Sequence, residues 1–134
     1  MAIGAVFTVS GMTSLLNRGF KTSPDYTVPS RFKIGTGTTT PAVADTKIET
    51  KISAWSGGSD FKNYVSGYPT FDVANQKITV QGFIASTEAN GNVISEYADF
   101  NTDSAPLISS HIVFTGITKA STVQVYVTTI YKRA

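Results

Sequence analysis

Apolar and polar residues alternate along much of this chain, most clearly in the segment TVQVYVTTIY near its end. Within it, Val123, Val125, Val127 and Thr129 share one side, opposite Thr122, Gln124, Tyr126 and Thr128. Alternation with a period of two is the pattern of a strand that buries one face. The segment therefore predicts a half-buried β-strand.

Further strands follow from the same pattern. QKITVQGFIAS alternates, and the Asn-Gly turn signal in TEANGNV predicts that it returns as a hairpin into VISEYADF. PLISSHIVF predicts another strand, and RFKI a short one. The chain is therefore expected to contain at least four strands joined by connections of hairpin length.

One segment, FTVSGMTSLLNRGF, has the pattern of a helix. Ser10 is the expected N-cap, Leu15 and Leu16 are expected to face inward, and Gly19 is expected to end the helix. This segment predicts a short helix near the start of the chain.

The stretch DTKIETKISAW fits a helical turn and a strand equally well, because Ile48 and Ile52 satisfy both periods. A chain of 134 residues has room for one domain with one core. The sequence therefore predicts a single domain, residues 1–134, that is mainly β. Its expected architecture is an antiparallel β-sandwich or small barrel with one short N-terminal helix.

Charge and composition limit the partners. Charged residues make up 15% of the chain and the net charge is +2, which is too small for a nucleic-acid-binding surface. A sparse charge supply is common where neighbouring subunits cover the surface. The start of the chain resembles neither a signal peptide nor a membrane anchor, and there is no cysteine. We therefore expect synthesis in the cytoplasm and no contact with nucleic acid or membrane.

The glycine-rich stretch RFKIGTGTTTPAVADT raises the question of phosphate binding. A P-loop needs a lysine at its end and a following helix, whereas this stretch has no such lysine and Pro41 interrupts it. The structural interpretation is that Gly35 and Gly37 form a structural turn in which both adopt positive φ at the end of a strand. No cofactor is expected.

Polar residues that could carry chemistry are few. In DFNTD, Asp99, Asn101 and Asp103 have the spacing that opens a calcium loop, but the glycine and glutamate that complete an EF-hand are missing. His111 is the only histidine, in a strand pattern and with no nucleophile motif. Glu96 is in phase with inward residues and is expected to be a hydrogen-bond anchor or a charge at a strand edge. No metal site, catalytic residue or enzymatic activity is expected.

Aromatic residues are concentrated between Trp55 and Phe71, interleaved with Gly, Ser and Asn. Such rings fill a core, anchor subunit interfaces or stack on sugars, and all three interpretations stay open here. The candidate interface or ligand residues are Trp55, Phe61, Tyr64, Tyr68 and Phe71.

Two segments resemble a recurring pattern in structural proteins of tailed-bacteriophage virions. RFKIGTGTTTPAVADTKIET has the apolar strand running into I-G-T-G-T, then a Thr-Pro stretch and Asp-Thr. GNVISEYADFNTDSAPLISSHIVFTGITKASTVQVYVTTIY resembles the second half of the pattern, with a strand of the type I-x-E-x-x-x-F-N and a T-G-I-T-K turn. Order and spacing both match, over nearly the whole chain.

The resemblance implies a small β-rich virion protein of the tail, baseplate or fibre-attachment kind, assembled in the host cytoplasm. Its expected partners are copies of itself and other virion proteins, with Met1–Val9 and Thr122–Tyr131 as candidate inter-subunit contacts. One alternative is a capsid decoration protein. The alternative from another class is a carbohydrate-binding module that recognises a host-surface glycan through Trp55, Tyr64 and Tyr68.

Overall fold

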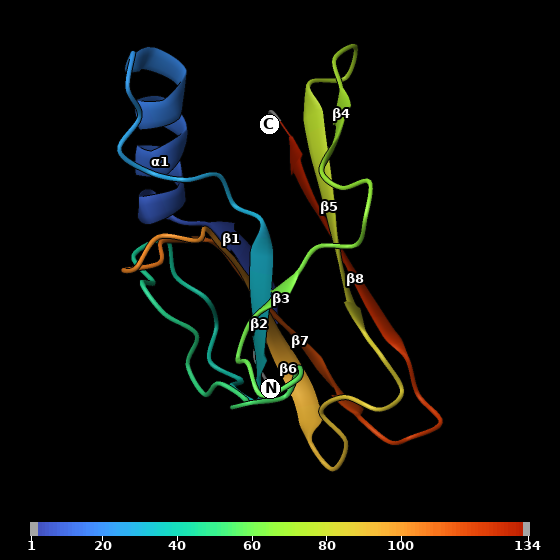
Figure 1. The fold of residues 1–134 in the computed structure, drawn as a ribbon. Coiled ribbons are helices and arrows are strands. Elements are labelled where there is room, and N and C mark those ends of the chain that lie inside the picture. Colours follow the sequence, from blue (N-terminus) through green and yellow to red (C-terminus); the bar gives the residue numbers. More distant parts are fainter. Residues whose placement is uncertain (1–2, 133–134) are drawn as a thin grey trace.

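The computed structural model describes residues 3–132, whose strands form two antiparallel sheets (Figure 1). One sheet has the order β1 (Gly4–Phe7), β7 (Ile108–Thr118), β6 (Val93–Phe100), β2 (Arg31–Gly35), β3 (Lys62–Asn63). The other has the order β4 (Thr70–Asp72), β5 (Lys77–Ile84), β8 (Val125–Lys132). The helix α1 (Val9–Phe20) contacts β7. The expected mainly β sandwich with a short N-terminal helix is confirmed.

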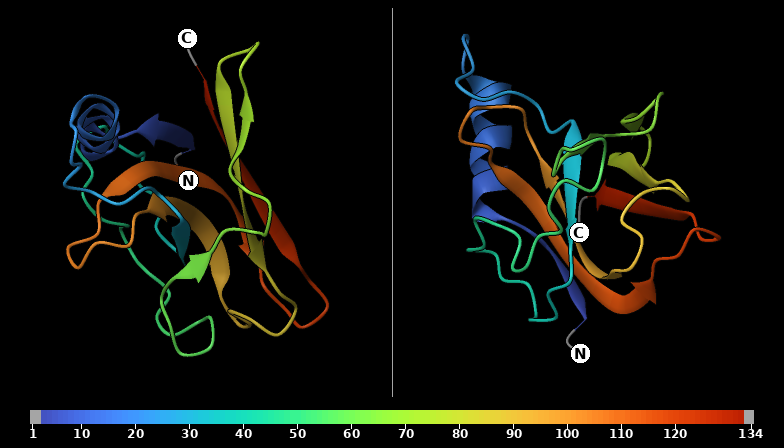
Figure 2. Two further views of the ribbon diagram at one scale, coloured as in Figure 1. Left: turned by 45° about the horizontal axis from the view of Figure 1, so that its top comes forward. Right: turned by 60° about the horizontal axis from the view of Figure 1, so that its bottom comes forward.

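The main core lies between the two sheets, which Figure 2 shows as separate layers. Phe32 of β2 stacks on Tyr97 of β6 with 5.0 Å between ring centroids, and Trp55 packs against the same Phe32 ring at 5.5 Å. The three-stranded sheet contributes Ile84 and Val125 to this cluster. Burial of these large side chains is the main contribution to the stability of the sandwich.

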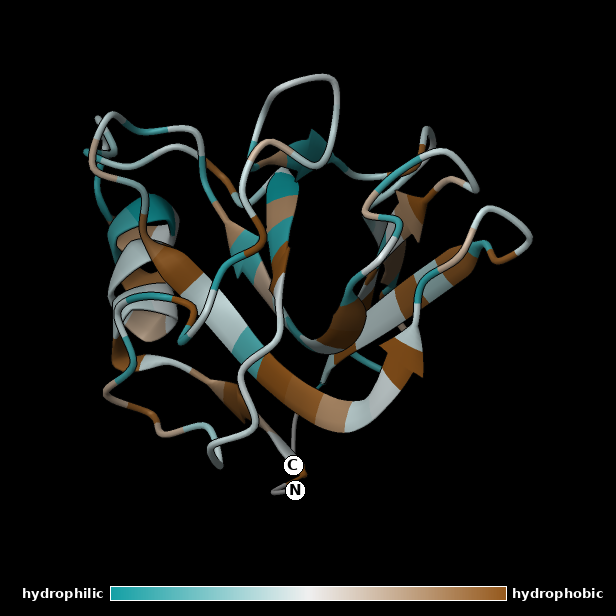
Figure 3. Ribbon diagram, turned by 90° about the horizontal axis from the view of Figure 1, so that it is seen from below, coloured by the Kyte–Doolittle hydropathy of each residue, from teal (hydrophilic) through white to brown (hydrophobic). Residues whose placement is uncertain are grey.

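The alternation at the end of the chain correctly predicted β8. Val125 and Thr129 are buried against the other sheet, whereas Tyr126 and Thr128 are exposed on the opposite face. The longest strand, β7, crosses Figure 3 as a curved ribbon in which apolar and polar stretches alternate. A period-two pattern thus identified these strands from local sequence.

The predicted hairpin between β5 and β6 is wrong. β5 pairs with β4 and β8, whereas β6 pairs with β2 and β7. The connection does turn at Gly91, whose φ is 86°, but it carries the chain from one sheet to the other. Ile84 and Ile94, at its two ends, then enter the same core from opposite sheets, which buries both.

The helix boundaries differ from the expected ones. The N-cap is Thr8, whose hydroxyl accepts a hydrogen bond from the N–H of Gly11 at 3.0 Å, and not Ser10. At the other end the helix passes through Gly19 and ends at Phe20. Nothing lies within 4 Å of the space where a Gly19 side chain would begin, so no close contact requires glycine there.

The orientation of α1 is also opposite to the prediction, because Leu15 and Leu16 are 53% and 51% exposed. Gly11 and Ser14 face the sheet instead. A Cβ on Gly11 would lie 2.7 Å from both the Phe7 ring and a β7 carbonyl oxygen. Because α1 lies so close to β7, only the side of the helix with small residues can face the sheet. The large apolar residues therefore face solvent.

The ambiguous stretch DTKIETKISAW is neither helix nor strand. It belongs to an irregular segment, residues 36–61, from which Ile52 and Trp55 enter the main core. The part up to residue 51 covers the face of the five-stranded sheet opposite the main core. Ile48 packs there against Ala98, Phe100 and Ile108. An isolated bridge between Gly35 and Lys51 fixes the segment beside β2.

The two terminal segments predicted as inter-subunit contacts pair within the chain. β1 pairs with β7, and β8 pairs with β5 over its whole length. Met1 and Ala2 of the first predicted segment lie outside the described residues. Among residues 3–132, no helix has the length and apolarity needed to cross a membrane.

Gly82→Ala should destabilise the fold. A Cβ at Gly82 would lie 2.9 Å from both Phe32 and Tyr97, between the sheets. Overpacking of this kind costs about 1–3 kcal/mol. Urea unfolding monitored by Trp55 fluorescence measures the loss. Gly19→Ala is the control: it lies in a helix with open space and should be neutral or stabilise by up to about 1 kcal/mol. Equal stability of all three proteins would contradict the predicted packing.

Candidate functional site

The carboxylate of Glu96 is the centre of a buried polar cluster on one face of β6. Residues 36–51 form the loop that covers this face. The Glu96 side chain is fully buried. Oε1 accepts hydrogen bonds from the backbone N–H of Gly37 at 3.0 Å and of Thr50 at 2.7 Å, and Oε2 from that of Glu49 at 3.0 Å. These bonds join β6 to both ends of the covering loop.

His111 of β7 connects Glu96 to the same loop from the other side. Its Nε2 lies 2.9 Å from Glu96 Oε2, and its Nδ1 lies 2.7 Å from Asp45 Oδ2. Since carboxylates only accept hydrogen bonds, an imidazole that binds one at each nitrogen must donate at both, which requires the protonated ring. The geometry therefore indicates an imidazolium between two carboxylates.

The pKa shifts agree with this assignment. Burial alone would lower the pKa of His111, but its hydrogen bonds to Glu96 and Asp45 outweigh burial and raise the pKa above 6.5. Burial would raise the pKa of Glu96, but the His111 and backbone hydrogen bonds lower it. Burial would also raise the pKa of Asp45, but the hydrogen bond from the backbone N–H of Ala42 and the bond to His111 lower it. All three groups are stabilised in their charged forms.

Glycine is required at positions 35 and 37 for a reason other than the positive φ that the sequence predicted. Neither has positive φ, so the prediction of a positive-φ turn is wrong. A Cβ on Gly37 would lie 2.6 Å from Glu96 Oε1, and one on Gly35 would overlap the same oxygen. Both positions must be glycine so that the backbone can approach the Glu96 carboxylate.

A surface hollow of about 370 Å³ lies beside this cluster. The residues that line it are Thr39, Thr40, Ala44, Asp45, Thr46, Lys47, Glu49 and His111. Both ring nitrogens of His111 are already bonded, and Glu49 accepts hydrogen bonds from the N–H and hydroxyl of Thr39. These bonds hold the loop in place, and Glu96 is confirmed as a hydrogen-bond anchor.

Asp99 forms a second buried cluster on the opposite face of β6, between the sheets. Its Oδ2 accepts hydrogen bonds from Tyr131 of β8 at 2.6 Å and from Ser110 of β7 at 2.7 Å. Its Oδ1 accepts one from Tyr64 at 2.9 Å. Burial raises the pKa of Asp99, although these hydroxyl donors oppose the shift. The side chain links both sheets through hydroxyls.

Asp99 does not join a calcium-like site with the DFNTD residues that follow it. Asn101 donates to Asp103 at 2.8 Å, and Asp103 accepts hydrogen bonds from Thr27. Over the described part of the chain, no three His, Asp or Glu side chains are grouped so that they could hold a metal ion.

The five predicted aromatic site residues do not form one platform. Trp55 is buried in the main core and donates from its indole N–H to the Asp60 carbonyl at 2.8 Å. Phe61 packs on Phe100 in the second cluster, with the Arg31 guanidinium 3.7 Å from its ring centroid. These two aromatic residues therefore have structural roles.

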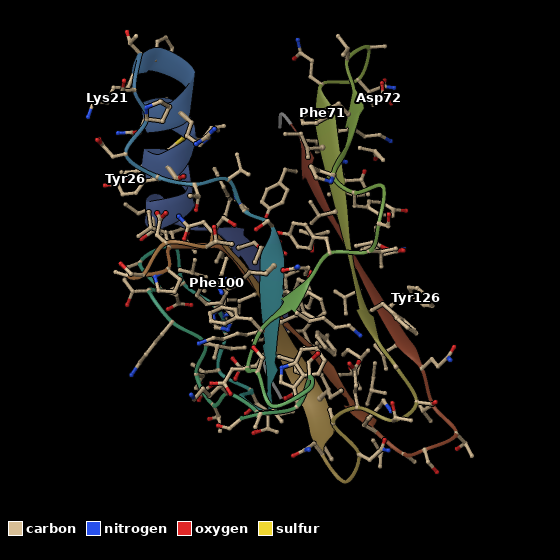
Figure 4. The ribbon with its side chains drawn as sticks, viewed as in Figure 1. Lys21, Tyr26, Phe71, Asp72, Phe100 and Tyr126 are labelled. Atoms are coloured by element: carbon tan, nitrogen blue, oxygen red, sulfur yellow. The ribbon has the colours of Figure 1, made fainter. Side chains whose placement is uncertain are left out.

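The remaining three, Tyr64, Tyr68 and Phe71, line a second hollow of about 590 Å³, together with apolar residues such as Val28 and Pro69. The Tyr64 hydroxyl is already bonded to Asp99, and Phe71 lies exposed on β4 near the tip of the small sheet (Figure 4). The structure thus brings together part of the predicted set.

Sequence reasoning missed the roles of Asp45 and Lys119. The segment GITKAS is expected from the sequence to be a turn, but its first three residues belong to β7. Lys119 directly follows this strand. It is buried, and its Nζ donates to the Asn90 side chain at 2.8 Å and to the carbonyls of Ser86 and Ala120. A lone lysine among polar residues carries no local signal of burial, because two of its partners, Ser86 and Asn90, come from a turn about 30 residues earlier.

Replacing Glu96 by Gln should cost about 3–5 kcal/mol in the free energy of unfolding, because it leaves the His111 imidazolium without one of its buried counterions. The new amide at position 96 also has a single acceptor oxygen, whereas the four groups that donate to Glu96 use both oxygens of its carboxylate. Chemical denaturation measures the loss. Glu49→Gln, at an exposed carboxylate of the same loop, is the control and should cost under about 1 kcal/mol. Comparable losses in the two variants would contradict the anchor role.

Stability should also depend on pH through His111. A raised pKa in the folded state adds stability that is complete below 6.5 and is lost as pH rises through the folded-state pKa. The lowered carboxyl pKa values of Glu96 and Asp45 act oppositely, so their contribution is complete above 4.5 and is lost in acid. The cluster therefore stabilises most between these values. Thermal unfolding across pH measures this, and His111→Gln should flatten the alkaline fall. An unchanged fall in the variant would assign it to another group.

In comparison with known proteins, no family model, curated protein or solved structure matches this chain.

Proposed function

We propose that this chain is a structural component of a tailed-phage virion, a tail, baseplate or fibre-attachment protein that acts by assembly with its own copies and with other virion proteins. Its surfaces, rather than a reactive centre, carry this function. The chain is made in the host cytoplasm and then becomes part of the particle. The observation that carries the assembly role is the exposed apolar side of α1.

That side is formed by four large residues with helical spacing, Val9, Met12, Leu16 and Phe20. All are exposed, and Phe20 is 88% exposed. A surface helix normally turns such a stripe toward its own core. Here the opposite, small-residue side faces β7, so the apolar stripe is free to bury against another molecule. Contiguous exposed apolar surface is typical of protein–protein contact sites.

The phage assignment is supported by how the two resembling segments meet. The glutamate of the I-x-E-x-x-x-F-N strand is Glu96, and the second glycine of I-G-T-G-T is Gly37, whose N–H donates to it. Asp45, in the Asp-Thr pair of the first segment, binds His111 in the second. The residues that carry the resemblance therefore form one structural unit in this fold.

The glycan-binding alternative has less support. Of its three predicted residues, Trp55 is buried and the Tyr64 hydroxyl is bonded to Asp99, which leaves Tyr68. A capsid decoration role uses the same kind of surface as a tail role. The number of copies of the chain in one particle distinguishes the two roles. A tail protein is expected in tens of copies or fewer, and a head protein in hundreds.

Leu16→Glu should reduce incorporation of the chain into particles about tenfold or more, because it removes a buried Leu from the contact and places a charge there. Quantitative immunoblotting of purified particles from a complementation assay measures incorporation. The control is Val93→Glu, at an apolar residue of similar exposure, 48%, far from α1 in the sequence.

Both variants should keep the thermal stability of the natural chain, since each changed side chain is exposed. Normal incorporation of Leu16→Glu would remove the α1 surface as the basis of the proposal. Absence of the natural chain from particles would overturn the virion role itself.

A further inference from the structure

We propose that β8 pairs with β8 of a second copy of this chain, antiparallel and about a twofold axis at Thr128, so that two three-stranded sheets become one of six strands. This inference deepens the proposed assembly function, on which it rests, by naming one contact and its partner.

The first support is the length of the free edge. Within residues 3–132, no strand pairs with β8 on the side away from β5. β8 has eight residues, whereas the edge strands β1, β3 and β4 have four, two and three. Proteins normally protect an edge by making it short, bulged, charged or proline-containing. β8 has a continuous register with β5, no proline, and one charge, Lys132, at its end.

Which backbone groups are free follows from β5. The carbonyl of Gln81 accepts a hydrogen bond from the N–H of Val65, on the side of β5 away from β8. Gln81 is opposite Thr128, so these two residues form a pair without mutual hydrogen bonds. The N–H and C=O of Thr128 therefore point to the free edge. The same holds for its neighbours of the same parity, Tyr126 and Ile130.

The residues with these free groups limit the possible registers. Two identical antiparallel edges bond best when residues with free groups stand opposite one another. With Thr128 opposite its own copy, Tyr126 stands opposite Ile130 of the other chain. These three pairs form about six backbone hydrogen bonds. Placing Thr128 opposite Ile130 instead would add a fourth pair within β8, but it would set Lys132, and not Ile130, opposite Tyr126. The side chains therefore decide between these two registers. A shift by one residue would place free groups opposite groups already bonded to β5.

Side chains at these positions suit the same register. Tyr126 and Ile130 are 58% and 51% exposed on the outer face of the sheet, and Figure 4 shows Tyr126 projecting away from the molecule. The Tyr126 ring already stacks on Phe83 with 4.6 Å between centroids, which fixes its position. An aromatic residue directly opposite a β-branched one is a favourable cross-strand pair.

Charge does not oppose the pairing. The one charged residue of β8, Lys132, would lie opposite Gln124 of the other chain, so no like charges face each other. A twofold contact of this kind is closed, because each copy uses its single β8 edge. The pairing therefore predicts a dimer in solution, and not an open fibre through this edge.

Analytical ultracentrifugation of the purified chain tests the pairing. The natural chain should dimerise reversibly, and Thr128→Pro should weaken the dimer about tenfold or more, because it removes an edge N–H from each copy at the axis. Proline is tolerated at such a position because that N–H makes no bond to β5. Thr128→Val is the matched control, since it keeps the N–H and should dimerise like the natural chain.

Cysteine cross-linking tests the register and does not depend on the proline variant folding. The chain has no cysteine, so each single-cysteine variant can form a disulfide only between copies. Thr128→Cys should oxidise to a dimer, because paired residues have Cα atoms about 5.5 Å apart. Tyr126→Cys alone should not, but a mixture with Ile130→Cys should cross-link. Thr70→Cys, exposed on β4 and away from the β8 edge, is the control and should form no disulfide-linked dimer.

A natural chain that stays monomeric at millimolar concentration would overturn the inference, as would cross-linking of Thr128→Cys no faster than of Thr70→Cys. Neither result touches the virion role, which depends on incorporation into particles. Conversely, a dimer with the predicted cross-links would support the pairing even if the chain were missing from particles.

Discussion

The carboxylate of Glu96 has to be satisfied away from water, and one whole face of the molecule is arranged around that requirement. Three backbone N–H groups and the His111 imidazolium point at its two oxygens. The loop from residue 36 to residue 51 supplies the three N–H groups, so it can close over the sheet only in the conformation that aims them inward. Gly35 and Gly37 are needed because any side chain there would occupy the space of the carboxylate.

The two faces of β6 show how one strand can hold different polar clusters. Glu96 faces the covering loop, whereas Asp99, three residues later, faces the other sheet. Charged donors and backbone amides lower the pKa of Glu96, while Asp99 has only neutral hydroxyl donors and its pKa is raised by burial. The first cluster fastens a loop to a sheet, and the second fastens sheet to sheet through Tyr131.

Two exposed surfaces of the described fold, residues 3–132, have no partner within it. Close packing of Gly11 on β7 turns the large side chains of α1 outward, and the small sheet ends at the long β8 edge. One surface offers apolar area and the other offers unpaired backbone groups. The two surfaces suit different contacts. An exposed apolar surface can pack against many apolar partners, whereas a strand edge requires a second strand in a defined register.

Local sequence determined the strands β2 and β8, the presence of the helix and the class of fold, because period-two and helical patterns record burial residue by residue. Only the tertiary structure decided that β5 and β6 separate into different sheets, that Leu16 faces solvent, that Trp55 is buried and that Asp45 reaches His111. Each of these depends on a partner far away in the chain. A side chain's own neighbours in sequence contain no record of what packs against it from 60 residues away, and that distant contact sets its role.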